Sequence, residues 1–229
     1  MRWRPDFRSG FHDRRDAGER LATVLLGMDI VDPVVLGLAR GGVAVAAPIA
    51  QRFGVELHAF IALKIGAPGQ PEFAIGAVAE GLGRNPDVVN VERVSMDRVE
   101  TNEKVIDLRV PDIEKQIRER QSLYRTSSPL PLIKGRTVVI VDDGIATGHT
   151  ARAACDAIAA DEPERLVVAV PVTARSALRT FTDVEIVALR RPESFRAVGQ
   201  FYDSFDQLSD EEVIELARSR PGCAHDPLR

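Results

Sequence analysis

Short apolar runs alternate with helical patterns along this chain. Most of the runs are continuous rather than alternating and are rich in β-branched residues, as is typical of strands buried on both faces. The predicted strands occupy residues 34–38, 55–63, 73–79, 138–141, 166–171 and 184–189. Apolar residues at helical spacing predict helices at residues 17–26, 41–52, 151–160 and 173–181, and a capped helix that begins near Ser209. This alternation predicts an α/β fold, a doubly wound, mostly parallel twisted sheet.

Two internal segments depart from the alternation. Residues 64–73 hold two glycines and two prolines, which disfavour regular structure and predict a mobile loop carried by a hairpin. Residues 96–124 are strongly charged around a narrow apolar stripe and contain Pro111. This pattern predicts either two helical segments or one kinked helix, with most of its surface in solvent.

The ends of the chain have compositions of their own. Residues 1–16 are rich in arginine and aspartate, and three placements are open for them: packed on the body, packed on a second subunit, or frayed. The C-terminal part carries aromatic residues spaced to form the core of a small lobe, Phe195, Phe201, Tyr202 and Phe205. We expect a single domain over residues 1–229 with a core at about 17–190. An inserted helical segment would occupy about 96–125, and the C-terminal lobe about 191–229.

The strongest candidate for chemistry is the stretch of residues 138–150, VVIVDDGIATGHT. A buried strand leads into two adjacent carboxylates, a turn of small residues and the start of a helix. Gly144 and Gly148 permit a turn whose N–H groups converge on one anion, at the positive end of the helix that begins near His149. Asp142 and Asp143 could accept hydrogen bonds from sugar hydroxyls or hold a divalent cation. The predicted ligand is a sugar phosphate.

A second loop of the same kind follows the strand at residues 34–38. It reads Ala39-Arg40-Gly41-Gly42 and leads into an alanine-rich helix. Here too backbone N–H groups are presented at the end of a strand, and the planar guanidinium of Arg40 suits phosphate oxygens. Open α/β sheets bind ligands at this edge.

The first stretch resembles the 5-phosphoribosyl-1-pyrophosphate (PRPP) motif of type I phosphoribosyltransferases, and the order of parts resembles a poorly characterised bacterial group of this family. The resemblance implies that Asp142 and Asp143 face the ribose 2- and 3-hydroxyls and take part in catalysis. It implies that the 5-phosphate is bound by Ala146, Thr147, Gly148, His149 and Thr150. It implies that pyrophosphate is bound by Ala39, Arg40, Gly41 and Gly42, in a loop that often contains a non-proline cis peptide. Lys64, at the start of the predicted mobile loop, would contact the pyrophosphate and assist catalysis.

The activity implied by this resemblance is transfer of a 5-phosphoribosyl group from PRPP to a nitrogenous acceptor, a nucleobase or related heterocycle, with release of pyrophosphate. Mg²⁺ would act through the substrate phosphates, with Asp142 and Asp143 as candidate protein ligands. Relatives commonly form homodimers, and a hood lobe covers the acceptor. Two departures leave the acceptor open. Ala146 stands where 6-oxopurine enzymes carry a third carboxylate, and no lysine or arginine lies between Lys64 and Arg84.

Composition narrows the class of protein. The formal net charge is −4 and the pI is near 5.7, which argues against a nucleic-acid partner held by bulk electrostatics. No apolar run approaches the roughly 20 residues of a membrane span, and the first residues lack a signal-peptide pattern. We therefore expect a cytoplasmic protein without a membrane partner. Cys155 and Cys223 are expected as free thiols, and the four histidines form no metal-binding spacing.

Two other functions fit parts of the sequence. A non-catalytic PRPP or nucleotide sensor would keep the phosphate loop, and the scarcity of cations after Lys64 favours it. A phosphohydrolase acting on sugar phosphates would need a base to activate water, and only the acidic pair could supply one.

Overall fold

The computed structural model describes residues 10–67, 70–81, 90–93, 99–125 and 130–218. Its centre is a five-stranded parallel sheet with the strand order β2-β1-β6-β7-β8. The strands are β1 (Val34–Leu38), β2 (Leu57–Phe60), β6 (Thr137–Val141), β7 (Arg165–Val172) and β8 (Glu185–Arg190). The expected α/β fold with a mostly parallel sheet is confirmed.

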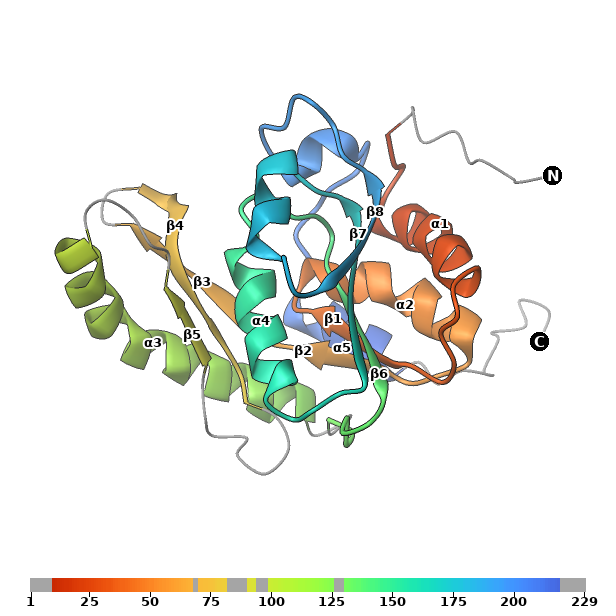
Figure 1. Ribbon diagram of the computed structural model, residues 1–229, viewed down its shortest axis with the longest axis horizontal. Coiled ribbons are helices and arrows are strands. Elements are labelled where there is room, and N and C mark those ends of the chain that lie inside the picture. The colour runs from red at the N-terminus through yellow and green to blue at the C-terminus, as the bar shows by residue number, and fades with distance from the viewer. Residues whose placement is uncertain (1–9, 68–69, 82–89, 94–98, 126–129, 219–229) are drawn as a thin grey trace.

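Helices cover both faces of this sheet (Figure 1). One face packs on α1 (Arg14–Leu26) and α2 (Gly41–Phe53), where Leu21 and Ile49 are buried beside Val139 of β6. The other face packs on α4 (His149–Ala159), whose Ile158 is buried with Ile140. Strand β6 is therefore apolar on both faces, which explains why its sequence is a continuous apolar run.

Most element boundaries match the sequence expectations. The helix α2 ends beside Gly54, which takes the left-handed conformation at φ +70°, as expected of a helix stop. The expected strand at residues 55–63 is divided, because the chain leaves the central sheet after Phe60 and continues in a second sheet from Ala62. The two short helices after β7 and β8 are 3₁₀ helices, η1 (Arg175–Thr180) and η2 (Val198–Phe201).

The second sheet is antiparallel and comprises β3 (Ala62–Ala67), β4 (Gln70–Ala79) and β5 (Asn90–Arg93). The expectation of irregular structure at residues 64–73 was therefore wrong. The antiparallel pairing continues past Gly66, with a register shift on each side of it. Glycine at this position therefore interrupts the register without ending the strand. A hairpin was expected and is confirmed. Residues 68–69, between its strands, lie outside the described part of the chain, and β5 was not predicted.

The charged segment forms one helix, α3 (Val99–Arg125), which continues through Pro111. Its narrow apolar stripe, Ile106, Ile113, Ile117 and Tyr124, is buried in the same cluster as Ile65 and Ile75 of the hairpin. The opposite side carries ion pairs between Glu114 and Arg118 and between Lys115 and Glu119. The charge run is thus a solvated face over a packed stripe, as the sequence pattern indicated.

A buried carboxylate joins this helix to the point where the chain changes sheets. The side chain of Glu80 is fully buried and accepts hydrogen bonds from the N–H of Ile61 at 2.7 Å and from Nε2 of Gln121 at 3.0 Å. Arg125 forms an ion pair with it and donates to the carbonyl of Ala59 at 2.8 Å. Burial raises the pKa of Glu80, and Arg125 opposes that effect. This network fixes the end of α3 against the junction of β2 and β3.

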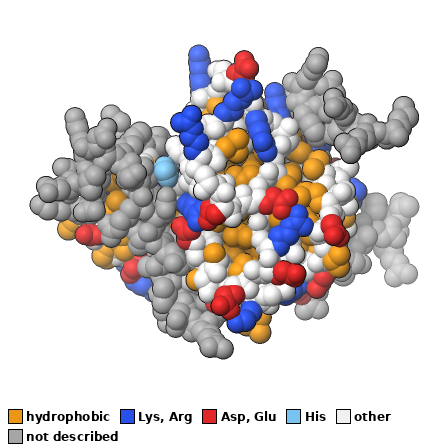
Figure 2. Space-filling view, viewed as in Figure 1, with side chains coloured by type: hydrophobic (Ala, Val, Ile, Leu, Met, Phe, Trp, Pro, Cys, Tyr) orange, Lys and Arg blue, Asp and Glu red, His pale blue; other side chains and the backbone are white. Residues whose placement is uncertain are grey.

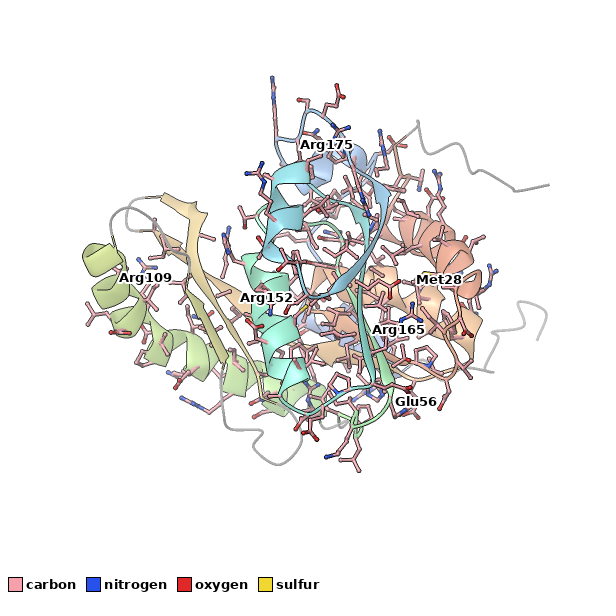
Figure 3. The ribbon with its side chains drawn as sticks, viewed as in Figure 1. Met28, Glu56, Arg109, Arg152, Arg165 and Arg175 are labelled. Carbon is pink, nitrogen blue, oxygen red and sulfur yellow. The ribbon has the colours of Figure 1, made fainter. Side chains whose placement is uncertain are left out.

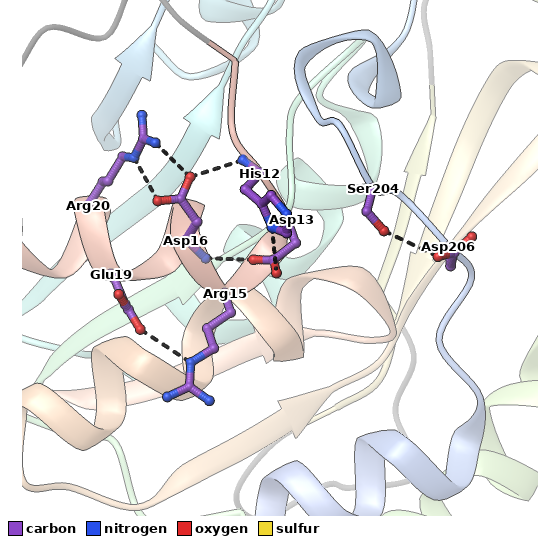
Figure 4. A network of polar contacts seen from close by, with 8 residues as sticks. All are labelled: His12, Asp13, Arg15, Asp16, Glu19, Arg20, Ser204 and Asp206. Atoms are coloured by element: carbon purple, nitrogen blue, oxygen red, sulfur yellow. Dashed lines mark hydrogen bonds and ion pairs between the residues drawn. The ribbon is translucent and has the colours of Figure 1, made fainter.

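The N-terminal segment packs against the C-terminal aromatic segment. The N–H of Phe11 donates to the carbonyl oxygen of Phe201 at 2.7 Å, and the N–H of Asp203 donates to the carbonyl oxygen of Phe11 at 2.8 Å. Asp13 then caps α1 by accepting from the N–H of Asp16 at 2.8 Å (Figure 4). Of the three placements expected for the arm, its residues from Gly10 onward are packed on the body. Residues 1–9 lie outside the described residues.

The last helix, α5 (Asp210–Arg218), has the expected cap: the N–H of Ser209 donates to Glu212 at 2.7 Å, and the N–H of Glu212 donates to Ser209 Oγ at 3.2 Å. Among the helices that the structure describes, none is long and apolar enough to span a membrane. On the face shown in Figure 2, basic side chains gather at the top, and acidic and basic side chains are interspersed below them.

Candidate active site

Two loops meet at the carboxyl edge of the central sheet. Strands β1 and β6 are parallel neighbours, with Gly37 opposite Val141, so the loops that follow them leave the same edge together. A Cβ at Gly42 would lie 2.4 Å from the carbonyl oxygen of Val141, and one at Gly41 would lie 1.9 Å from Oδ2 of Asp143. The structure therefore brings the two loops predicted from sequence into direct contact.

The first loop joins β1 to α2. Its Ala39–Arg40 peptide bond is cis, as the family resemblance led us to expect. The N–H of Ala39 donates to the carbonyl of Phe60 at 2.8 Å, which ties the loop to β2. Arg40 is the N-cap residue of α2, and Gly41 is its first residue. The first N–H groups of a helix have no partner within it, so this loop can offer donors to an anion.

The second loop joins β6 to α4. Gly148 is the N-cap residue of α4 and has φ +91°, and a Cβ there would lie 2.8 Å from Cε2 of Phe181. The N–H of Ile145 donates to Val172 at 2.9 Å, which holds the loop against β7. Ala146 and Thr147 are exposed, whereas His149 and Thr150 are half-buried at the start of the helix. The five residues expected to bind a phosphate thus surround one helix N-terminus.

The two carboxylates are the first residues of the second loop, and that of Asp143 lies against Gly41 of the first loop. Oδ1 of Asp142 accepts a hydrogen bond from the N–H of Asp143 at 2.9 Å. Burial and then the charge of Asp143 raise the pKa of Asp142 well above its ordinary value. Burial also raises the pKa of Asp143, and the guanidinium of Arg14 opposes that rise. The pair therefore favours binding of a cation or of hydrogen-bond donors.

Two residues that the sequence interpretation did not assign to the site contact Asp143. Nε of Arg14 donates to Oδ2 of Asp143 at 2.9 Å, and the hydroxyl of Tyr202 donates to the carbonyl of Asp143 at 2.6 Å. Both belong to segments noted for composition alone, the Arg/Asp-rich arm and the aromatic tail. Burial raises the pKa of the Tyr202 hydroxyl, which therefore acts as a donor.

The C-terminal aromatic side chains pack on one another and on the N-terminal segment, where Tyr202 lies 5.4 Å from Phe11 between ring centroids. Phe195 lies 5.4 Å from Phe201 between ring centroids, and Tyr202 lies 4.9 Å from Phe205. Phe201 and Tyr202 are each 7% exposed. Phe201 and Tyr202 are therefore core residues, in one cluster with Phe11, Ala17 of α1 and Val172 of β7, and the expected small lobe stays a prediction.

Lys64 stands apart from the two loops. It is an exposed residue of β3 and lines a groove of about 360 Å³ between the hairpin and α3. The groove also contains Arg109 and Arg120, and Arg109 lies on the side of α3 that faces the hairpin (Figure 3). The structure thus groups Lys64 with cations of the inserted helix.

Comparisons with known proteins identify the family and the fold of this chain. The model of the phosphoribosyl transferase domain family matches residues 14–202. Two Mycobacterium tuberculosis proteins, from strains CDC 1551 and H37Rv, are each 41% identical over 211 residues and carry the name "Putative phosphoribosyl transferase". The aligned region covers 89% of this chain and 45% of theirs, so the chain spans about half the length of the curated relatives that it matches.

A solved structure supports the fold over nearly the whole chain. The crystal structure of a protein from Thermus thermophilus is 39% identical, with a TM-score of 0.75. It covers 93% of this chain and all of its own. The family model includes both loops and the acidic pair. The chain therefore belongs to the phosphoribosyl transferase domain family.

Proposed function

We propose that this protein transfers the 5-phosphoribosyl group of PRPP to a nitrogenous acceptor, a nucleobase or related heterocycle, and releases pyrophosphate. One observation carries the proposal: two loops able to donate N–H groups are in contact across Gly41 and Asp143, and the second of them begins with a carboxylate pair. PRPP has a phosphate at one end, a pyrophosphate at the other and a diol between. Each part of the substrate then has a matching part of the site.

The proposed roles follow from position. Residues 146–150 bind the 5-phosphate at the N-terminus of α4, and residues 39–42 bind the pyrophosphate at the N-terminus of α2. Asp142 and Asp143 accept hydrogen bonds from the ribose hydroxyls. In the reaction, the bond from ribose C1 to a pyrophosphate oxygen breaks and a bond from C1 to the acceptor nitrogen forms. The carboxylate pair stabilises positive charge that develops on the ribose, and the Arg40 loop stabilises the leaving group.

Magnesium fits this site through its donor chemistry. The described residues hold no cluster of three or more His, Cys, Asp or Glu side chains arranged to bind a metal ion. Asp142 and Asp143 offer oxygen ligands of the kind that Mg²⁺ prefers, with the remaining ligands supplied by water and substrate phosphates. When bound, Mg²⁺ would neutralise charge on the pyrophosphate. The proposal also retains two expectations from the family resemblance, a homodimer and a contact of Lys64 with pyrophosphate when substrate is bound. It retains the cytoplasmic location that we expect from the sequence.

The decisive experiment supplies PRPP, MgCl₂ and a panel of purine, pyrimidine and other heterocyclic bases, and measures nucleotide and pyrophosphate by mass spectrometry. We expect one class of base to give equal amounts of both products. The variants Asp142→Asn and Asp143→Asn should each lower the rate by about a hundredfold or more, since each removes charge opposite the developing cation. Asp29→Asn, an exposed carboxylate elsewhere, is the matched control and should be fully active. No product from any base would contradict the transferase proposal.

The sensor hypothesis makes a different prediction. It is favoured by the absence of lysine and arginine between Lys64 and Arg84, the region that would otherwise supply charge to a leaving group. A sensor would bind PRPP or a nucleotide in calorimetry without turnover, and Lys64→Ala would leave that binding unchanged. A transferase that uses Lys64 would instead lose catalytic rate in this variant. Arg109→Ala, in the same groove, separates a specific role of Lys64 from a general loss of positive charge.

A further inference from the structure

We propose that Arg14 is a positioning residue that, together with Tyr202, fixes Asp143 in the orientation that binds the ribose. The inference rests on the proposed function and adds to it a residue outside both substrate loops. The site would then be completed by a clamp, defined as Arg14, Tyr202, Phe205 and the carbonyl of Asp206. Phe205 and Asp206 lie beyond the residues that match the family model, which end at 202.

The contact between Arg14 and Asp143 is nearly buried. The exposed fractions of the two side chains are 12% and 16%, and Nε lies 2.9 Å from Oδ2. At this burial, solvent screens the ion pair only weakly, so its strength depends on both the charges and the direction of the hydrogen bond. Arg14 binds one carboxylate oxygen, Oδ2, which leaves Oδ1 to accept a hydrogen bond from a ribose hydroxyl.

Arg14 is itself held from two further directions. Its Nη1 donates to the carbonyl oxygen of Asp206 at 2.7 Å, and its guanidinium lies over the ring of Phe205, 3.9 Å from the centroid. A planar guanidinium that is stacked on one face and hydrogen-bonded along its edge has little freedom to rotate. Arg14 therefore transmits the position of the C-terminal segment to the carboxylate.

The backbone of Asp143 is held as well. The hydroxyl of Tyr202 donates to its carbonyl at 2.6 Å, and Tyr202 is fixed by the parallel bridge to Phe11. The side chain and main chain of Asp143 are thus bound by different residues of the same clamp. The neighbouring Arg15 differs in each respect. It is 76% exposed and pairs with Glu19, one helical turn away (Figure 4).

The test compares binding of two halves of the substrate. Isothermal titration calorimetry with ribose 5-phosphate, and separately with pyrophosphate and MgCl₂, is performed on the wild type, Arg14→Gln, Arg14→Lys, Tyr202→Phe and the control Arg15→Gln. Thermal unfolding of each variant confirms that it is folded at the temperature of the titration. Arg14→Gln should raise the Kd for ribose 5-phosphate by about tenfold to a hundredfold, the range for loss of a hydrogen bond between charged groups. Arg14→Lys should recover part of the loss, because lysine keeps the positive charge but lacks the planar guanidinium.

The remaining variants define the mechanism. Tyr202→Phe removes one hydroxyl and should raise the same Kd by about threefold to tenfold. Arg15→Gln should match the wild type. The Kd for pyrophosphate should change less than about threefold in Arg14→Gln, because the donors that the Arg40 loop offers are main-chain N–H groups, which this substitution leaves in place.

Two results would overturn the inference while leaving the proposed function intact. One is unchanged affinity for ribose 5-phosphate in folded Arg14→Gln, alongside a wild type that binds it. The other is an equal loss of affinity for both ligands, which would mean that Arg14 maintains the site as a whole. A wild type that binds neither ligand would contradict the proposed function itself, and the inference with it.

Discussion

A Cβ atom at Gly41 would lie 1.9 Å from Oδ2 of Asp143, closer than any non-bonded contact allows. The same atom would lie 3.1 Å from Nε of Arg14. Glycine at this position therefore lets the two substrate loops touch. Gly41→Ala should displace the Asp143 carboxylate and raise the Kd for PRPP by at least about tenfold, on the scale of one lost charged hydrogen bond. Calorimetry with PRPP and MgCl₂ measures the change.

Gly27→Ala is the control for that substitution. Gly27 is the C-cap residue of α1, away from the site, and has φ −81°. A Cβ there would lie 3.3 Å from its nearest neighbour, the carbonyl oxygen of Val24. This variant should bind PRPP as the wild type does. Wild-type affinity in Gly41→Ala would show that Asp143 can move without consequence, and that the contact between the loops is incidental.

The phosphate loop allows a comparison between two glycines with positive φ. Gly148 has φ +91°, and a Cβ there would lie 2.8 Å from Cε2 of Phe181. Gly135 has φ +69°, and a Cβ there would have no neighbouring atom within 4 Å. Alanine at either position should lower the free energy of unfolding by about 1–2 kcal/mol, the strain of a left-handed residue. Only Gly148→Ala should also weaken binding of ribose 5-phosphate. Urea unfolding and calorimetry separate the two effects, and equal ligand affinity in both variants would remove Gly148 from the proposed site.

Glu80 gives a prediction about stability. Glu80→Ala would leave the guanidinium of Arg125 and the N–H of Ile61 without their buried acceptor. We expect the free energy of unfolding in urea to fall by about 3–5 kcal/mol, as in other broken buried ion pairs. Glu114→Ala breaks a more exposed pair with Arg118 and should cost less than about 1 kcal/mol. Similar losses in the two variants would mean that the Glu80 network contributes no more than a surface pair.

Cys155 gives a prediction about pH. Its thiol is fully buried in α4, and burial raises its pKa from 9.0 to about 12. The folded state therefore favours the neutral thiol, so this contribution to stability is complete below about pH 9 and is lost as the pH rises toward 12. In a Cys223→Ser background, Cys155 should not react with a disulfide reagent at pH 8 until urea unfolds the chain. Rapid reaction in the folded state would contradict its burial. Cys155→Ala should reduce the alkaline loss of stability.

The central sheet could be predicted because its signal is local. Strand β6 is buried on both faces, so every residue from Val138 to Val141 is apolar and the run is visible without knowledge of its neighbours. The second sheet lacks that signal. In β3 and β4, glycine and alanine are held in strands by antiparallel pairing, such as Gly66 with Ala74, which depends on the partner strand. The division of residues 55–63 at Ile61 likewise depends on Glu80, a residue far along the chain.

The candidate site shows the same division. Each loop lies within one segment, so the order of glycines, carboxylates and hydroxyls was sufficient to predict it. The clamp has no such local pattern. Arg14 contacts Asp143 across 129 residues of sequence, and Tyr202 contacts it across 59. Among the many arginines and aromatic residues of those segments, only the folded chain identifies these two.

The separation of the clamp residues has a consequence for biosynthesis. The hydrogen bond from Arg14 to Asp206 joins positions 192 residues apart, so it cannot form on the ribosome until Asp206 has been translated. Both substrate loops and the five parallel strands are made before that point. A nascent protein could thus hold a nearly finished sheet while its ribose carboxylate is still unrestrained. Ligand affinity would then be acquired after the parallel sheet has formed, because contacts of such long range close slowly.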